Sequence, residues 1–150
     1  MFSNCFSQTS ENDKEDLSYD TPIPIICEVE MEMKSFVMGF HEYRVIWTPK
    51  ENDVLHAHME PGNKKDSYAV AVHGEKNAIV GHLMKGKSGR FAKTIFYFLQ
   101  ANEHHECTVR VTGKAVNQGD TKGMKVPCIL MFKGQREYVD VLNKELKKYS

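Results

Sequence analysis

Residues 81–88 read GHLMKGKS and fit the phosphate-binding loop pattern G-x-x-x-x-G-K-[ST]. In such a loop the backbone N–H groups hold phosphates, Lys87 would reach the outer phosphates and Ser88 would bind magnesium. Two features oppose this interpretation. The residues between the glycines are bulky, and the chain offers too few helical crossovers to build the parallel sheet that such a loop needs. Nucleotide binding at 81–88 is therefore a remote alternative.

Seven histidines raise the question of a metal site. His56 and His58 are two residues apart in an expected strand and share one face, whereas His104 and His105 fall in a turn. Zinc usually needs four converging ligands, and neither pair has a cysteine or carboxylate at ligand spacing. We therefore expect solvent-exposed histidines, no metal and no other cofactor. No nucleophile motif of a hydrolase or protease is present either, so we expect a protein that is not an enzyme.

The distribution of charge is the first indication of a partner. The 150 residues include 20 basic and 20 acidic side chains, so the formal net charge is zero. Residues 1–20 hold five acids and one base, while residues 61–100 hold seven bases and two acids. The basic middle favours a phosphate-bearing partner. Its strip of basic side chains comprises Lys85, Lys87, Arg90 and Lys93.

The sequence also bears on the compartment. It contains no apolar run of about 18 residues, and its first residues do not resemble a secretory signal, so we expect no membrane association. The four cysteines are widely spaced and a chain of this size does not need disulfides, which favours reduced thiols inside the cell, in the nucleus or cytoplasm. These cysteines are Cys5, Cys27, Cys107 and Cys128.

Short strands are the elements that must position these residues. We expect strands at 27–33, 36–40, 54–59, 68–73, 78–83, 106–112 and 126–132. Residues 74–77 are a good hairpin connection. Strict alternation predicts that Cys107, Val109 and Val111 point inward. The run at 126–132 is apolar on both faces and predicts a buried strand.

Two helices complete the expected fold. Phe91, Ile95, Phe98 and Leu99 recur at helical spacing, with Ser88 as the expected N-cap. Apolar residues from Tyr138 to Tyr149 mark a C-terminal helix, whose expected apolar set is Tyr138, Val141, Leu142, Leu146 and Tyr149. Strands separated by turns, with one helix inserted late, predict a mainly β (α+β) fold: a small six- or seven-stranded barrel with an inserted and a C-terminal helix. We divide the chain into a flexible acidic tail (1–24), the barrel (25–134) and the C-terminal helix (135–150).

The most informative segment is MEPGNKKDSYAVAV at 59–72, followed by IVGHL at 79–83. Pro61 to Asn63 should form a turn, and Asn63 or Asp66 can accept hydrogen bonds from nearby backbone N–H groups, so a purely structural role for both stays open. The segment resembles the HIRAN domain, whose hallmark is R/E-P-x-N-x-x-D-x-x-A-[IV]-x-V followed by V-G-[HY]-[LI]. The segments FVMGFHEY at 36–43 and VPCILMFKG at 126–134 extend the resemblance to about two thirds of the chain.

The resemblance implies a modified oligonucleotide-binding (OB-like) barrel. Characterised members bind single-stranded DNA, including a free 3′ end. They are attached to remodelling ATPases that act on stalled replication forks in DNA repair. Carried over to this sequence, Tyr43 would stack on a base and Asp66 would contact the terminal hydroxyl. His82 and Lys85 would lie near phosphate, and the basic strip would extend the electrostatic groove.

Two positions depart from the family pattern. Lys65 stands where members that bind DNA ends carry an aromatic residue, and Met124 stands where a second aromatic is frequent. The resemblance therefore implies binding of single-stranded DNA, with recognition of DNA ends as the narrower and weaker expectation. A protein-interaction adaptor that keeps the barrel but has lost DNA-end binding is the alternative, with the acidic tail and the C-terminal helix as its contact elements.

Overall fold

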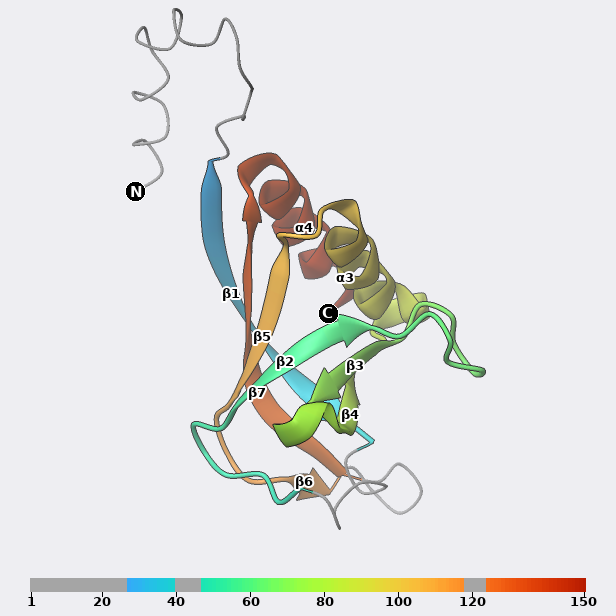
Figure 1. Ribbon diagram of the computed structural model, residues 1–150, viewed down its shortest axis with the longest axis vertical. Helices are drawn as coiled ribbons and strands as arrows, with labels where there is room; N and C mark the ends of the chain where they lie inside the picture. The colour runs from blue at the N-terminus through green and yellow to red at the C-terminus, as the bar shows by residue number, and fades with distance from the viewer. Residues whose placement is uncertain (1–26, 40–46, 118–123) are drawn as a thin grey trace, which may run out of the picture.

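The computed structural model describes residues 27–39, 47–117 and 124–150 (Figure 1). Its elements in chain order are β1 (Glu28–Met38), β2 (Val54–Met59), β3 (Val70–His73), the 3₁₀ turn η2 (Glu75–Asn77), β4 (Ile79–Leu83), the 3₁₀ turn η3 (Lys87–Gly89), α3 (Arg90–Ala101), β5 (Glu106–Val111), β6 (Val116–Asn117), β7 (Met124–Gln135) and α4 (Arg136–Tyr149). Among the described residues, no helix is both long and apolar enough to cross a membrane.

Six strands close into an antiparallel barrel. Their order is β1-β4-β3-β2-β5-β7, and β7 pairs back onto β1 from Glu28↔Gln135 to Met38↔Lys125. The short β6 adds to the edge of β7 beside β5. β3 and β4 form the expected hairpin across residues 74–77. The structure confirms the small β-barrel with one inserted helix and a C-terminal helix.

β1 differs from the expectation because it is one strand where the sequence pattern predicts two. Its first half alternates exposed glutamates with half-buried apolar residues, as expected for a strand with one solvated face. Ser35 is only 4% exposed and continues the inward face, so the alternation is not interrupted between the two predicted strands. The strand ends at Met38 and is followed by Gly39, whose φ of +72° lies in the left-handed region that glycine adopts without strain.

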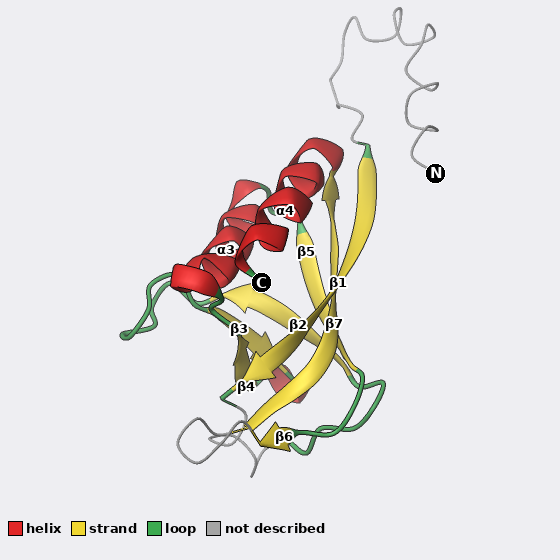
Figure 2. Cartoon of the chain, turned by 180° about the vertical axis from the view of Figure 1, so that it is seen from behind, coloured by secondary structure: helices red, strands yellow, loops and turns green. Residues whose placement is uncertain are grey.

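The core lies between the barrel and two helices that pack on each other and on one side of it (Figure 2). The residues predicted to point inward are confirmed as buried. They are Phe91, Ile95, Phe98 and Leu99 in α3, and Cys107, Val109 and Val111 in β5. In α4 the buried residues are Val139, Leu142 and Leu146, whereas Tyr138 and Val141 are 45% and 59% exposed. The prediction is therefore confirmed for Leu142 and Leu146, and Tyr149 packs against the core, but it was wrong for Tyr138 and Val141 and missed Val139. The spacing of 139, 142 and 146 selects the face toward the barrel.

Four further expectations need correction. Ser88 is not the N-cap of α3, since Gly89 occupies that position in the left-handed conformation. His105 is only 6% exposed, so the histidines are not all solvated. The second apolar face of β7 lies outside the barrel and is only half-buried, so this strand is buried on one face alone. Cys27 is disulfide-bonded, so the expectation of reduced thiols is wrong there.

The other two described cysteines are free and buried, as expected for small core residues. Burial raises the pKa of the Cys128 thiol to about 12 and that of Cys107 higher still. Neither thiol is therefore ionised near neutral pH, and both act as apolar packing groups.

Candidate functional site

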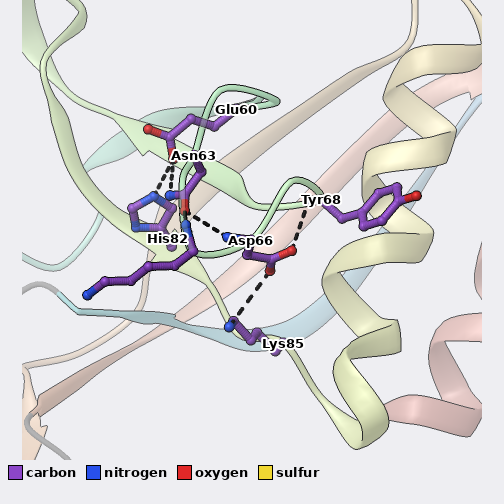
Figure 3. Close-up of polar contacts among 7 residues, drawn as sticks. Glu60, Asn63, Asp66, Tyr68, His82 and Lys85 are labelled. Carbon is purple, nitrogen blue, oxygen red and sulfur yellow. Dashed lines mark hydrogen bonds and ion pairs between the residues drawn. The ribbon is translucent and has the colours of Figure 1, made fainter.

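The loop between β2 and β3 is held in shape by its own side chains (Figure 3). Asn63 Oδ1 accepts hydrogen bonds from the backbone N–H groups of Lys65 (2.8 Å) and Asp66 (3.0 Å). Asp66 Oδ1 in turn accepts the N–H of Tyr68 at 2.9 Å. These short side chains satisfy backbone donors that the turn leaves without strand partners. The sequence prediction that Asn63 and Asp66 order the entry to the next strand is confirmed.

Glu60 links this loop to the barrel. Its Oε1 accepts Asn63 Nδ2 at 3.0 Å and lies 2.6 Å from His82 Nε2 on β4. Partial burial tends to raise the pKa of Glu60, but the hydrogen bonds from Asn63 and His82 outweigh it and hold that pKa below its ordinary value. The carboxylate therefore stays ionised and fixes the position of the His82 ring.

Asp66 also faces a basic side chain from the other rim of the site. Lys85 Nζ lies 3.8 Å from Asp66 Oδ2, and the lysine side chain is 64% exposed while that of Asp66 is 23% exposed. The backbone of Lys85 is fixed because its carbonyl accepts the N–H groups of Phe91 (2.8 Å) and Ala92 (3.3 Å) at the start of α3. The stem of Lys85 is thus anchored, while its ammonium group remains open to solvent and to a ligand.

An open cavity of about 630 Å³ lies at this place, and Asn63, Asp66, His82 and Lys85 are among the residues that line it. The loop after β2 forms one wall, and the ends of β1 and β4 with the first turn of α3 form the other. Three lysines line the cavity, at Lys64, Lys65 and Lys85, against the single carboxylate of Asp66. The floor is apolar and is contributed by Met38, Ala69, Val70, Leu83, Met84 and Ala92. Such a cavity suits a ligand that combines negative charge with a flat apolar surface.

The structure brings only part of the predicted site together. Lys65, Asp66, His82 and Lys85 all line the cavity. Tyr43 lies outside the described residues. The remaining predicted residues, Lys87, Arg90, Lys93 and Met124, are not among the residues that line the cavity.

Two of the basic side chains outside the cavity contact aromatic rings. Lys93 Nζ lies 4.5 Å from the centre of the Tyr68 ring, and the Arg90 guanidinium lies 5.6 Å from that of Tyr149. Both are cation–π contacts, which attach these side chains to the surface of α3 and its neighbours. Lys87 is exposed in η3, and Met124 pairs with β6. The predicted basic strip is therefore divided between the cavity rim and the helix surface.

Sequence reasoning missed several residues of the site. Lys64 adjoins Lys65 in the hallmark loop, and its position in the sequence could have identified it. Met38 and Met84 were not foreseen, because only the pairing of β1 with β4 brings them beside the loop. Lys125 lies across from Met38 on β7 and covers the Phe36 ring at 4.0 Å, so it adds positive charge beyond the cavity rim.

The phosphate-binding loop is not formed at residues 81–88. Gly81 lies inside β4, where it pairs with Val72 of β3, and β4 itself runs antiparallel to both of its neighbours, so this glycine is not in a loop after a parallel strand. A Cβ atom at Gly81 would lie 2.6 Å from Val37 Cγ1 and 2.9 Å from the Met38 carbonyl oxygen. Glycine is therefore required here by close strand packing, which explains the residue without a phosphate ligand.

The closed antiparallel barrel with a helix after β4 and a charged cavity beside it is an OB-like barrel with a HIRAN-like fold. No family model and no curated protein matches this sequence. Among solved structures, the crystal structure of the HIRAN domain of human HLTF is similar, with a TM-score of 0.60 and 22% identity over 81% of this chain and 91% of that chain.

Two solution structures agree with this comparison. The NMR structure of the HLTF HIRAN domain has a TM-score of 0.56 and 19% identity, and the NMR structure of that domain in its DNA-bound conformation has a TM-score of 0.56 and 21% identity. Each covers 81% of this chain and 90% of the other. The resemblance inferred from the sequence is therefore confirmed at the level of the fold.

Proposed function

We propose that this protein is a nucleic-acid-binding module that takes single-stranded DNA into the cavity between the β2–β3 loop and the start of α3. The observation that carries the proposal is the excess of lysine over carboxylate around an apolar floor. Ammonium groups release counterions from phosphates, and an apolar floor accommodates the face of an unstacked base. The DNA-bound conformation of the similar HLTF domain supports DNA as the ligand, and the choice of a single strand rests on the cavity and on the sequence resemblance.

The roles within the cavity follow from geometry. Lys64, Lys65 and Lys85 are exposed at the rim and would contact phosphates. Asp66 Oδ2 faces the cavity beside Lys85, while Oδ1 is occupied by the Tyr68 N–H. One carboxylate oxygen thus remains to accept a hydrogen bond from a terminal 3′ hydroxyl. We propose a binding role without catalysis and, because DNA repair is the setting of the family, a location in the nucleus or cytoplasm.

Recognition of DNA ends is the narrower part of the proposal. Lys65 supplies charge where DNA-end-binding members of the family carry an aromatic ring, so it strengthens phosphate contact but offers no stacking surface. The proposed stacking by Tyr43 rests on the resemblance alone. We therefore expect binding to single strands in general, with a small preference for a free 3′ hydroxyl.

The test is fluorescence anisotropy with labelled single-stranded DNA over a salt series from about 50 to 200 mM. Affinity should fall steeply with salt. Lys85→Glu should weaken binding to all sequences and flatten the salt slope by about one unit per lost phosphate contact. Asp66→Asn keeps an oxygen for the Tyr68 N–H but removes the charge, so it should abolish any preference for a 3′ hydroxyl over a 3′ phosphate.

Lys133→Glu is the matched control. Lys133 Nζ lies 3.9 Å from Glu28 Oε1, which resembles the separation of Lys85 and Asp66, but it lies near the opposite end of the β1–β7 ladder from Met38. This variant should bind as the wild type does. Equal weakening by both variants would show that only overall charge matters. No measurable binding of DNA or RNA at about 50 mM salt would reject the proposal and leave the protein-interaction adaptor.

A further inference from the structure

Three histidines lie together on the outer face of β2 and β3, and none of them lines the proposed DNA cavity. His56 and His58 alternate along β2, and His73 is the cross-strand partner of His56 on β3. The rings of His58 and His73 are 5.0 Å apart between centroids and nearly perpendicular. Those of His56 and His58 are 6.4 Å apart. The sheet register therefore places three imidazoles on one patch of the surface, with the His58 ring near the other two.

We propose that His56, His58 and His73 bind one divalent transition-metal ion, with Zn²⁺ as the best-suited ion. Imidazole nitrogen is a preferred ligand of zinc, copper and nickel. This site goes beyond the proposed function and does not depend on nucleic-acid binding. It also revises the sequence expectation of no metal, which considered the two histidines of β2 without a partner from another strand.

The separation of the rings fits shared coordination. Two imidazoles on a tetrahedral Zn²⁺, with Zn–N bonds of about 2.0–2.1 Å, place their ring centres roughly 5 Å apart. His58 and His73 already have this spacing. Within the described residues no group of three such side chains is placed to hold a metal ion, so binding requires the centre of the His56 ring to move from 6.4 Å to about 5 Å from that of His58. Its side chain is exposed at the barrel surface, and rotation about its χ angles can supply this movement without disturbing the core.

The environment of His73 orients its ring for a metal. Its Nδ1 lies 3.1 Å from the carbonyl oxygen of Asn77 in the β3–β4 connection. A carbonyl only accepts hydrogen bonds, so Nδ1 carries the proton and the lone pair is on Nε2. Histidines that ligate metals usually donate their second N–H to a carbonyl or carboxylate in this way. The hairpin turn thus fixes the tautomer that a ligand at this position needs.

Neighbouring carboxylates also suit the site. A cavity of about 480 Å³ adjoins His56 and His58, and Glu103 and Glu106 line it. A carboxylate or a water molecule there can complete a four-coordinate ion.

The experiment titrates the full chain at neutral pH with Zn²⁺ alone by calorimetry and with Co²⁺ alone by visible absorption. We expect one saturable ion per chain and the absorption bands of tetrahedral Co²⁺ without sulfur charge transfer. His58→Asn and His73→Asn should each reduce the affinity by more than about tenfold, because each removes a direct ligand. His104→Asn is the matched control, since His104 is a surface histidine, 69% exposed, that lies beside Glu103.

Three outcomes would overturn the proposal. The first is the absence of saturable binding by the wild-type chain. The second is equal affinity in the wild type and in both ligand variants, which would assign the ion to another part of the chain. The third is a loss in His104→Asn as large as that in His58→Asn, which would indicate unspecific histidine binding. Circular dichroism of each variant checks that the barrel is folded, which is expected because these side chains lie outside the core.

Discussion

The two ends of α3 carry polar clusters of opposite character. At the C-terminal end, His105 is 6% exposed and both ring nitrogens have partners: Nδ1 lies 2.7 Å from the Phe98 carbonyl oxygen, and Nε2 accepts the Gln135 N–H at 3.3 Å. At the N-terminal end, Lys85 and Asp66 are separated by 3.8 Å and the ammonium group remains exposed. We call the buried cluster around His105 the closed cluster, and the exposed cluster around Lys85 and Asp66 the open cluster.

The difference separates structural from binding roles. A buried imidazole costs free energy unless its polar atoms are paired, and His105 meets this condition while its ring stacks on Phe98 with centroids 4.3 Å apart. Gly134 leaves the space, since a Cβ atom there would lie 2.6 Å from His105 Cδ2. The open cluster has spare charge instead, because three lysines face one carboxylate. A satisfied cluster stabilises the fold, and an unsatisfied, exposed one can attract a ligand.

The largest expected effect concerns the closed cluster. Phe98→Ala should lower the free energy of unfolding by about 3–5 kcal/mol, because it removes a buried ring that stacks on His105 and meets Phe132 edge-on. Chemical denaturation measures this. Tyr97→Ala, at a neighbouring position that is 47% exposed, is the control and should cost far less. An unchanged midpoint for Phe98→Ala would show that α3 does not pack on the barrel.

A smaller loss is expected in the open cluster. Asn63→Ala should lower the free energy of unfolding by about 1–2 kcal/mol, because two backbone N–H groups lose their acceptor in a loop that water can still reach. DNA affinity should fall as well, since the same loop carries Lys64 and Lys65. Denaturation and anisotropy measured on one sample test both effects. If Asn63→Ala is destabilised but binds DNA with the affinity of the wild type, binding does not require the ordered loop.

Lys93→Met tests where the open cluster ends. The substitution keeps the length of the side chain and removes the charge above the Tyr68 ring, which should cost about 0.5–1 kcal/mol of stability. Because Lys93 does not line the cavity, DNA affinity should change less than in Lys85→Glu. Anisotropy with both variants at one salt concentration decides this. A loss of DNA affinity equal to that of Lys85→Glu would show that the binding surface extends along α3.

The smallest effect is confined to acid. The folded-state pKa of Glu60 is depressed, so its ionised form contributes stability above its ordinary pKa of 4.5, and this contribution is lost as the pH falls through the folded-state value. The contribution is modest because solvent reaches the carboxylate. Unfolding measured between about pH 3 and pH 7 should show a smaller acid decline for Glu60→Gln than for the wild type. Identical declines would show that the contacts of Glu60 with Asn63 and His82 do not favour its charge.

Local sequence was sufficient for much of the fold. The alternation in β5 and the helical spacing of Phe91, Ile95, Phe98 and Leu99 identified buried faces correctly, because these elements meet the core with one regular side. The hallmark loop was also predictable, since Asn63 and Asp66 bond backbone groups within three residues of themselves. Such a loop is predictable because the donors and acceptors of its hydrogen bonds lie within the same short segment of sequence.

Other features depend on residues distant in the sequence. His105 occurs in a polar turn and is buried only because α3 and β7 enclose it. Ser88 was a plausible cap, but the chain turns at Gly89 so that the carbonyl of Lys85 can meet the first turn of α3. The interpretation of the motif at 81–88 also depended on distant residues, because close packing against Val37 and Met38 of β1 requires glycine at position 81.

The sequence by itself determined the local periods, the hallmark loop and the overall excess of positive charge between residues 61 and 100. Only the tertiary structure decided which charges act together. It placed Lys65 and Lys85 on one cavity, left Lys87 and Lys93 outside it, and brought His73 beside His58. The physical reason is that periodicity fixes the face on which a side chain lies, whereas the register between strands fixes its neighbours.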